Sequence, residues 1–426
     1  KLIAREKAMP AALAEARKNL DNPPKIATEI ALQQIDGNGA FFADAVSAAF
    51  PEVKDAALLA EFKQANDAVV AAFKEYGSWL KSDLLPRSNG DFAIGADTYR
   101  RKLAADEMID TPLDQLLAIA QADLSRNKAA FVEVARQIDA KKAPIEVLIQ
   151  VAKDHPPAAK LLDVTQSELD AIARFMTEHH IITIPPAAPA RVQETPPFMR
   201  ATTFASMDTP GAYETVAKEA YFNVTLPEKG WSKERVENFM RGFNRGTILS
   251  TAIHEAYPGH YVQFLWVQRL DSRVRKLLGA STNVEGWAHY CEQMMFDEGY
   301  GKGSPDFNKL RLGQIQDALL RDARYIAGIE MHTGKRTFEQ AVEFFEKEGY
   351  QTHETALRET KRGTSDPTYL YYTLGKLQIL KLREDYRKMR GAKFSLEEFH
   401  TNFMKQGYPP VKIVRKALLG NDSPTL

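Results

Sequence analysis

Apolar residues recur at helical spacing along the first 178 residues. The segments 59–85, 113–138 and 167–179 place apolar side chains at steps of i, i+3, i+4 and i+7, as expected for helices with one buried face. Proline-containing breaks, such as Pro156-Pro157, separate the helical segments. The pattern therefore predicts a series of helices, and we expect these helices to be scaffold.

The pattern changes at about His179. Short β-branched or aromatic runs separated by Pro and Gly fill residues 180–227, and these runs predict a small antiparallel sheet. Ser232 is a typical helix N-cap, and the helix that it begins is expected to reach Arg245 or the segment beyond. We therefore divide one continuous domain into a helical part, a sheet subdomain and a second helical part, at residues 1–178, 179–230 and 231–426.

Composition narrows the class of protein. The 426 residues are 44% hydrophobic, which is enough for a large core. Lys+Arg and Asp+Glu balance at 56 each, and no basic stripe suggests a nucleic-acid partner. No apolar run approaches the roughly 18 residues that a membrane span needs. The sequence thus predicts a folded domain without a transmembrane segment.

The segment from His254 to His260, HEAYPGH, contains residues typical of a zinc site. In the common HExxH pattern the histidines are four residues apart, but Pro258 occupies that position here. His260 would lie about 9 Å along an ideal helix and roughly 120° off the face of His254. Proline ends a helical run, and Gly259 can take backbone angles that other residues avoid. We therefore predict a helix interrupted at Pro258-Gly259, which swings His260 back toward His254.

A third ligand is expected in the segment NVEGWAHYCE. Glu285 lies 25 positions after His260, and on a helix it shares a face with His289 and Glu292. A catalytic zinc needs about three protein ligands and one open position. Glu255 is placed to act as the general base. Zinc is inferred from histidine and carboxylate ligation, and Mn²⁺ or Co²⁺ could occupy the same set of ligands.

HEAYPGH followed by EGWAHY resembles the bacterial domain-of-unknown-function family 885, whose members are often described as gluzincin-like peptidases. Further similar segments, such as YYTLGKL at 371–377, extend the resemblance over nearly the whole chain. The resemblance implies a mainly helical, zincin-like fold of the gluzincin or neurolysin type, with the small sheet beside the metal helix. Relatives often carry a further N-terminal region behind an export or lipoprotein signal. We therefore expect a cell-envelope or periplasmic protein that lacks an N-terminal region here.

The resemblance also implies individual roles. Glu285 matches the first Glu of the family motif and is favoured as the third ligand over His289, which falls at a variable position. Glu292 matches the second Glu and is expected to orient a ligand histidine. Tyr372 and His332 match a family tyrosine and histidine that stabilise the developing oxyanion. Tyr371 remains a rival to Tyr372, because the sequence does not decide which phenol faces the metal.

Substrate contacts are expected at two places. A turn just before the metal helix could bind an extended peptide beside an edge strand, and it could equally be a structural turn. Arginines from the later helices could bind a substrate carboxylate with two parallel hydrogen bonds. The residues concerned are Gly211, Ala212, Tyr213 and Glu214 in the turn, and Arg321, Arg324 and Arg362 among the arginines.

These observations lead to one hypothesis and two alternatives. We expect a zinc-dependent hydrolase with one zinc per chain, most simply a metallopeptidase that acts on peptides or small amides. The first alternative is a zinc hydrolase of a non-peptide amide or ester. The second is a non-catalytic binding protein that keeps the fold, although the presence of Glu255 beside three ligands argues against it.

Overall fold

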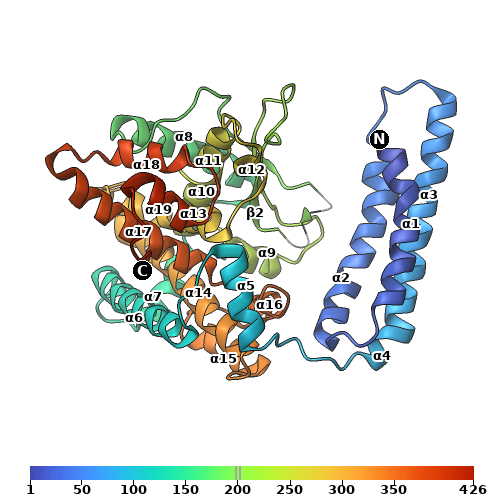
Figure 1. The fold of residues 1–426 in the computed structure, drawn as a ribbon, viewed down its shortest axis with the longest axis horizontal. Helices are drawn as coiled ribbons and strands as arrows, with labels where there is room; N and C mark the ends of the chain where they lie inside the picture. The colour runs from blue at the N-terminus through green and yellow to red at the C-terminus, as the bar shows by residue number, and fades with distance from the viewer. Residues whose placement is uncertain (197–198, 201–202) are drawn as a thin grey trace. The chain divides into compact units, whose positions relative to one another are not determined.

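The computed structural model describes residues 1–196, 199–200 and 203–426, and these form two compact units. Unit 1 consists of residues 1–94 with the described residues 196, 199 and 200, and unit 2 consists of residues 95–195 and 203–426. Helices dominate both units, as the periodicity predicts (Figure 1). No helix in the described part of the chain is both long and apolar enough to cross a membrane.

Unit 1 is built from three long helices that pack side by side (Figure 1). Asp55 begins the third of these helices by accepting hydrogen bonds from the N–H groups of Ala57 and Leu58, both at 3.0 Å. The helical elements are α1 (Leu2–Asn19), α2 (Lys25–Phe41), η1 (Phe42–Val46), α3 (Ala56–Trp79), η2 (Leu80–Leu84) and α4 (Leu85–Arg87). The helical run from α3 to α4 confirms the helix expected over 59–85.

Unit 2 contains the remaining helices, including the two further helices that the periodicity predicts. Its early helices are α5 (Ala96–Glu107), α6 (Leu113–Ile138), α7 (Pro144–Val151), η3 (Ala158–Lys160) and α8 (Leu161–Glu178). Its later helices are α9 (Lys233–Arg241), α10 (Arg245–Glu255), α11 (His260–Val267), α12 (Arg273–Leu277), α13 (Ser281–Asp297), α14 (Phe307–His332), α15 (Phe338–Lys347), α16 (His353–Ser365), α17 (Tyr371–Arg390), η5 (Gly391–Lys393), α18 (Leu396–Met404) and α19 (Val411–Leu419).

The predicted antiparallel sheet is a three-stranded mixed sheet in the described residues. The strands are β1 (Arg191–Glu194), β2 (Ala205–Asp208) and β3 (Tyr221–Val224). β3 lies in the middle, antiparallel to β2 but parallel to β1. The expectation of a purely antiparallel sheet is wrong. The long connection between β1 and β3, which includes β2, brings the chain back to the end of the sheet where β1 begins, so β3 runs in the same direction as β1.

The β-branched run at 179–185 is another difference from the predicted sheet, because it forms no strand. Its backbone groups bond to side chains of α18 instead. His400 Nδ1 lies 2.7 Å from the carbonyl of Ile181, and the N–H of Thr183 donates to Thr401 Oγ1 at 3.3 Å. The apolar residues still enter the core, since Ile181 is buried. Side-chain partners thus replace the ladder that the sequence pattern suggests.

The interior of unit 2 brings the central helices unusually close at two glycine pairs. A Cβ on Gly375 of α17 would lie 2.0 Å from the carbonyl oxygen of Thr282 and 2.7 Å from Cα of Gly286 on α13. A Cβ on Gly246 of α10 would lie 3.1 Å from Cα of Gly313 on α14. These pairs let the backbones of α10, α13, α14 and α17 approach one another, and this packing fixes the helices that carry the candidate site.

Candidate functional site

The predicted helix break is present and turns the chain between the two histidines. Helix α10 ends at Glu255 and α11 begins at His260. Gly259 takes backbone angles that other residues avoid, as predicted, because its φ of −68° and ψ of −133° are neither helical nor extended. A Cβ there would also lie 1.8 Å from the carbonyl oxygen of His254. Trp287 of α13 also donates a hydrogen bond from Nε1 to the carbonyl of Pro258 at 2.9 Å, which ties the turn to that helix.

Glu285 is brought to the same place by α13. The first turn of this helix is capped from far away in the sequence, because the Glu107 carboxylate accepts from the N–H groups of Ser281 and Thr282 at 2.8 and 3.0 Å. Sequence reasoning missed Glu107, since nothing local marks a residue at the end of α5 as the cap of another helix. The close contact of Gly286 with α17 then fixes the helix beside Glu285.

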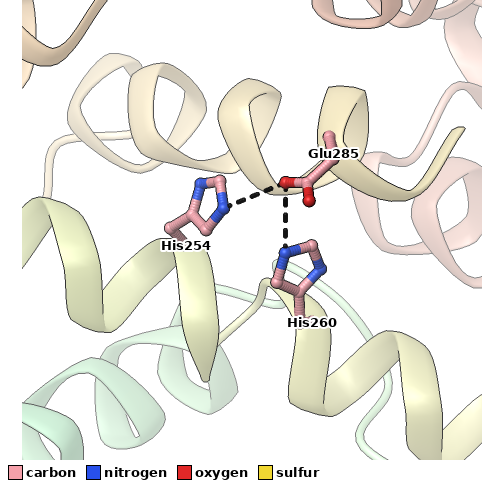
Figure 2. A group of neighbouring side chains, drawn as sticks. All are labelled: His254, His260 and Glu285. Atoms are coloured by element: carbon pink, nitrogen blue, oxygen red, sulfur yellow. Dashed lines mark ion pairs between the residues drawn. The ribbon is translucent and has the colours of Figure 1, made fainter. Parts of the chain in front are cut away.

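His254, His260 and Glu285 form the group of potential metal ligands found in the described part of the chain, with ligand atoms within 4.8 Å of one another. His254 Nε2 and His260 Nε2 lie 3.3 and 3.4 Å from the same atom, Glu285 Oε2 (Figure 2). Both histidines are buried, whereas 26% of the Glu285 side chain is exposed. The cluster is therefore held in the interior, with Glu285 Oε2 itself buried, and the rest of the Glu285 side chain is partly exposed.

Glu292 lies behind His254 at the centre of a chain of polar contacts. Its Oε1 accepts from His254 Nδ1 at 2.7 Å, and its Oε2 lies 3.1 Å from His289 Nδ1. Arg321 Nη2 lies 3.2 Å from Glu292 Oε1, so this arginine is paired inside the protein, and the substrate contact expected of it stays a prediction. Glu292 and His289 thus lie beside the cluster, on the side away from Glu285 Oε2.

These contacts shift the pKa values of the cluster. Burial would lower the pKa of His254, but contacts with Glu285 and Glu292 outweigh burial and raise it to about 10. Burial would raise the pKa of Glu285, yet its contacts with His254 and His260 hold it well below the usual range. For Glu292, the charge of Arg321 outweighs the same effect of burial and also lowers the pKa. The carboxylates are therefore ionised and available as ligands or acceptors.

Glu255 faces the edge of the sheet. Its Oε2 accepts a hydrogen bond from the N–H of Met207 at 3.2 Å. Met207 belongs to β2, which is an edge strand, and this N–H points away from β3. The sheet edge and the expected general base therefore lie side by side next to the histidine cluster.

The structure distinguishes the two adjacent tyrosines of α17. Tyr372 is buried and its ring stacks beside that of His254, with centroids 6.2 Å apart. Tyr371 instead donates to Asp366 Oδ2 at 2.7 Å. Burial and the charge of Glu285 raise the pKa of Tyr372, which keeps its proton in place. Tyr372 is the phenol that faces the cluster.

The remaining expected residues have other partners. His332 Nε2 lies 2.7 Å from the carbonyl of Gly363, and the His332 ring packs 6.3 Å from that of Tyr99, so its catalytic role stays a prediction. Arg324 donates to both oxygens of buried Glu359, at 2.6 and 3.1 Å.

The turn at 211–214 is exposed at its tip. The Glu214 carboxylate accepts hydrogen bonds from the N–H groups of Thr215 and Val216 at 2.8 and 2.6 Å. Tyr213 lies under the ammonium group of Lys276, 5.1 Å from the ring centroid. The substrate contacts expected of Gly211, Ala212 and Tyr213 stay predictions.

Comparison with known proteins gives the family of the chain and its fold. The family DUF885, described as a bacterial protein of unknown function, matches residues 1–418. A candidate lipoprotein of unknown function from Shewanella oneidensis is 28% identical, with a TM-score of 0.80 over 98% of this chain and 77% of that chain. A candidate lipoprotein from Colwellia psychrerythraea is 18% identical, with a TM-score of 0.83 over 98% and 75%. No curated protein matches.

Proposed function

The chain belongs to the bacterial family DUF885, and for this member of the family we propose a metal-dependent hydrolase, most simply a zinc metallopeptidase. One observation carries the proposal. Two ligands of a tetrahedral zinc, each about 2.1 Å from the ion, lie about 3.4 Å apart. His254 Nε2 and His260 Nε2 lie 3.3 and 3.4 Å from Glu285 Oε2, and within the described residues this oxygen makes no hydrogen bond. The ligand atoms of the three residues lie within 4.8 Å of one another, so the two histidines would close slightly around one ion.

The chemistry of the three donors also fits a zinc ion. Two imidazole nitrogens and one carboxylate oxygen form a ligand set found in zinc hydrolases. His254 Nδ1 donates to Glu292, which leaves Nε2 as the atom that faces the common point, and this contact fixes the ring. When bound, a divalent cation here polarises a carbonyl oxygen and makes a neighbouring water more acidic.

Glu255 supplies the proton transfers in this proposal. The residue follows His254 directly, and the N–H of Met207 holds one of its carboxylate oxygens. Its other oxygen can accept the proton of the attacking water and later return that proton to the leaving nitrogen. Glu255 thereby assists both the formation and the breakdown of the tetrahedral intermediate of the substrate.

Tyr372 and the edge of the sheet orient the substrate in this proposal. The Tyr372 phenol can donate a hydrogen bond to the oxygen of the substrate carbonyl as negative charge develops on it. An extended peptide can add alongside β2, because antiparallel or parallel pairing satisfies its backbone groups at an edge strand. This edge is the feature that favours a peptide over a small ester as the substrate.

Metal content tests the site. We supply zinc to the purified protein and measure the metal by elemental mass spectrometry. We expect about one zinc per chain, because the three ligands form one site. His260→Ala is expected to lose that zinc, whereas His353→Ala, which removes an exposed histidine on α16, is expected to retain it. A wild-type protein that takes up no zinc, manganese or cobalt contradicts the proposal.

Amine release tests the reaction. A panel of short peptides is compared with small amides and esters, and Glu255→Gln is the control that retains the metal. We expect peptide cleavage that falls by about 10²-fold to 10⁴-fold in Glu255→Gln. Cleavage of esters alone would favour the alternative hydrolase, and bound metal without any turnover would favour a binding protein.

We also propose that the protein acts in the cell envelope. Two structures of similar fold are described as candidate lipoproteins, and this description supports such a location. Fractionation of cells that express the complete gene, followed by detection with an antibody against this chain, tests the location.

A further inference from the structure

Arg362 holds two neighbouring phenols with one nitrogen of its guanidinium group. Its Nη2 lies 3.2 Å from the oxygen of Tyr371 and 3.1 Å from the oxygen of Tyr372. The same nitrogen lies 3.4 Å from Asp366 Oδ2. A guanidinium group only donates hydrogen bonds, so both phenol oxygens act as acceptors toward Arg362.

The two phenols direct their own protons differently. A phenol has a single O–H proton to donate. Tyr371 donates its proton to Asp366 at 2.7 Å. For Tyr372, the described residues provide no hydrogen-bond acceptor, and its ring lies beside His254, where the charge of Glu285 acts on it. Because Arg362 donates to the Tyr372 oxygen from one side, the O–H of Tyr372 is left to point toward the histidine cluster on the other side.

The other arginines near Tyr372 do not perform this task. Arg324 and Arg321 lie over the Tyr372 ring, 4.9 and 5.9 Å from its centroid. Arg324 donates from Nε and Nη2 to Glu359, and Arg321 pairs with Glu292. Within the described residues, Arg362 is the side chain that hydrogen-bonds to the oxygen of Tyr372.

We propose that Arg362 is a positioning residue, which holds the phenol of Tyr372 so that its O–H points to the site formed by His254, His260 and Glu285. This role differs from the expected one, in which Arg362 binds a carboxylate of the substrate. The orientation of Tyr372 stands on the contacts alone, and its use in catalysis rests on the proposed hydrolase function. Since 38% of the Arg362 side chain is exposed, an experiment must separate the two roles.

The first test needs no substrate. 3-Fluorotyrosine is placed at position 372 of the full chain, and its ¹⁹F resonance is recorded at neutral pH. Arg362→Met is expected to shift or broaden that resonance, because the phenol loses its donor. Arg358→Met, which changes an exposed arginine one turn earlier on α16, is expected to leave it unchanged. An unchanged resonance in a folded Arg362→Met protein overturns the proposal.

A second variant covers the case in which Arg362→Met does not fold. Arg362→Lys keeps the charge, but a lysine cannot reproduce the planar guanidinium geometry. Its circular dichroism spectrum is expected to match that of the wild type. The ¹⁹F resonance is expected to move in this variant as well, and an unchanged resonance here also contradicts the proposal.

Kinetics separate positioning from substrate recognition. Peptides with a free and with an amidated C-terminus are compared once a cleaved peptide is known. We expect Arg362→Met to lower kcat by about 10²-fold on both peptides with little change in KM, as for the loss of one oxyanion donor. In the Tyr372→Phe background the same change is expected to add no further loss.

The opposite pattern identifies a recognition residue. A rise in KM that is confined to the free carboxylate, and that persists in Tyr372→Phe, would assign Arg362 to substrate binding and overturn the positioning role. If no peptide or amide is cleaved, the proposed hydrolase function fails, and the ¹⁹F resonance still decides whether Arg362 orients Tyr372.

Discussion

Two buried polar clusters lie beside helix α17 and differ in how their charges are satisfied. In the first, Lys376 donates to Asp123 at 2.8 Å, while Asn127 and Thr373 donate to the two oxygens of Asp322 at 2.6 and 3.1 Å. In the second, His254 Nε2 and His260 Nε2 both lie close to Glu285 Oε2. Within the described residues, this oxygen has no hydrogen-bond partner.

The difference shows how a structural network can be told from a candidate binding site. Lys376 is 1% exposed, and its network closes within the protein because the carboxylate oxygens have donors. In the cluster around Glu285, the oxygen Oε2 is buried without a hydrogen-bond partner among the described residues, and the ligand atoms of the three residues lie within 4.8 Å of one another. A buried polar group without a partner costs free energy, so such a cluster calls for a ligand, whereas a closed network does not.

The largest expected effect comes from breaking each cluster in turn. Lys376→Met leaves Asp123 with a weakened set of donors in the interior, and we expect a loss of about 3 to 5 kcal/mol in the free energy of unfolding. Zinc content per folded chain is expected to stay unchanged. Glu285→Gln is the matched opposite, with zinc lost and little change in stability. Urea unfolding and metal analysis of both variants give the answer, and similar losses of stability would erase the comparison.

The next effect concerns the contact that holds both clusters in place. Gly375→Ala puts a Cβ about where the Thr282 carbonyl lies, since the ideal position is 2.0 Å from that oxygen. We expect α17 to move and the free energy of unfolding to fall by about 1 to 3 kcal/mol. Gly211→Ala, at a glycine with nothing within 4 Å of its Cβ position, is the control. Equal melting temperatures for the two variants would contradict this expectation.

A smaller effect is expected from the residue behind the histidines. Glu292→Gln keeps the size of the side chain but removes the charge that holds His254 Nδ1 and Arg321. We expect zinc affinity to fall by about 10-fold to 100-fold, as for other residues that orient a metal-binding histidine. Competition with a coloured chelator measures the change. Unaltered affinity would mean that His254 is oriented by its packing alone.

The smallest effect tests a histidine that belongs to a closed network. His400 lies 2.8 Å from the hydroxyl of Tyr290 and 2.7 Å from the carbonyl of Ile181, and burial lowers its pKa to about 3. Below the unfolded pKa of about 6.5, the unfolded chain binds a proton at His400 and the folded chain does not. The free energy of unfolding therefore falls as the pH drops below about 6.5.

The size of this pH effect can be measured directly. Between neutral pH and about pH 5.5, His400 is expected to account for a loss of about 1 kcal/mol. His400→Gln should remove that part of the slope in urea titrations, whereas His353→Gln, at an exposed position, should not. An identical slope in all three proteins would show that other groups cause the acid sensitivity.

The sequence indicates much of the fold and the nature of the site. Helical periodicity locates α6 and α8, and Pro258-Gly259 predicts the break between α10 and α11. These features are local, so a short stretch of sequence suffices to predict them. The mixed sheet was not predictable, because the direction of β1 relative to β3 depends on a long connection and not on either strand.

Other parts of the site also depend on distant contacts. The choice between Tyr371 and Tyr372 is made by Asp366 and by the packing of α17 on α13, neither of which has a periodic pattern. Likewise, the sequence predicts the unusual backbone angles of Gly259 but not the close approach of the His254 carbonyl group from the preceding helix.

Glu107 affects when the candidate site can form during protein synthesis. The carboxylate that caps α13 leaves the ribosome 174 residues before Ser281, the first residue that it binds. The contact between Glu107 and Ser281 therefore cannot form until the long stretch of chain between them has been synthesised. Contacts between residues so far apart in sequence are also slow to form. The end of α13 that lies next to Glu285 is thus expected to mature late, after the more local helix pairs have formed.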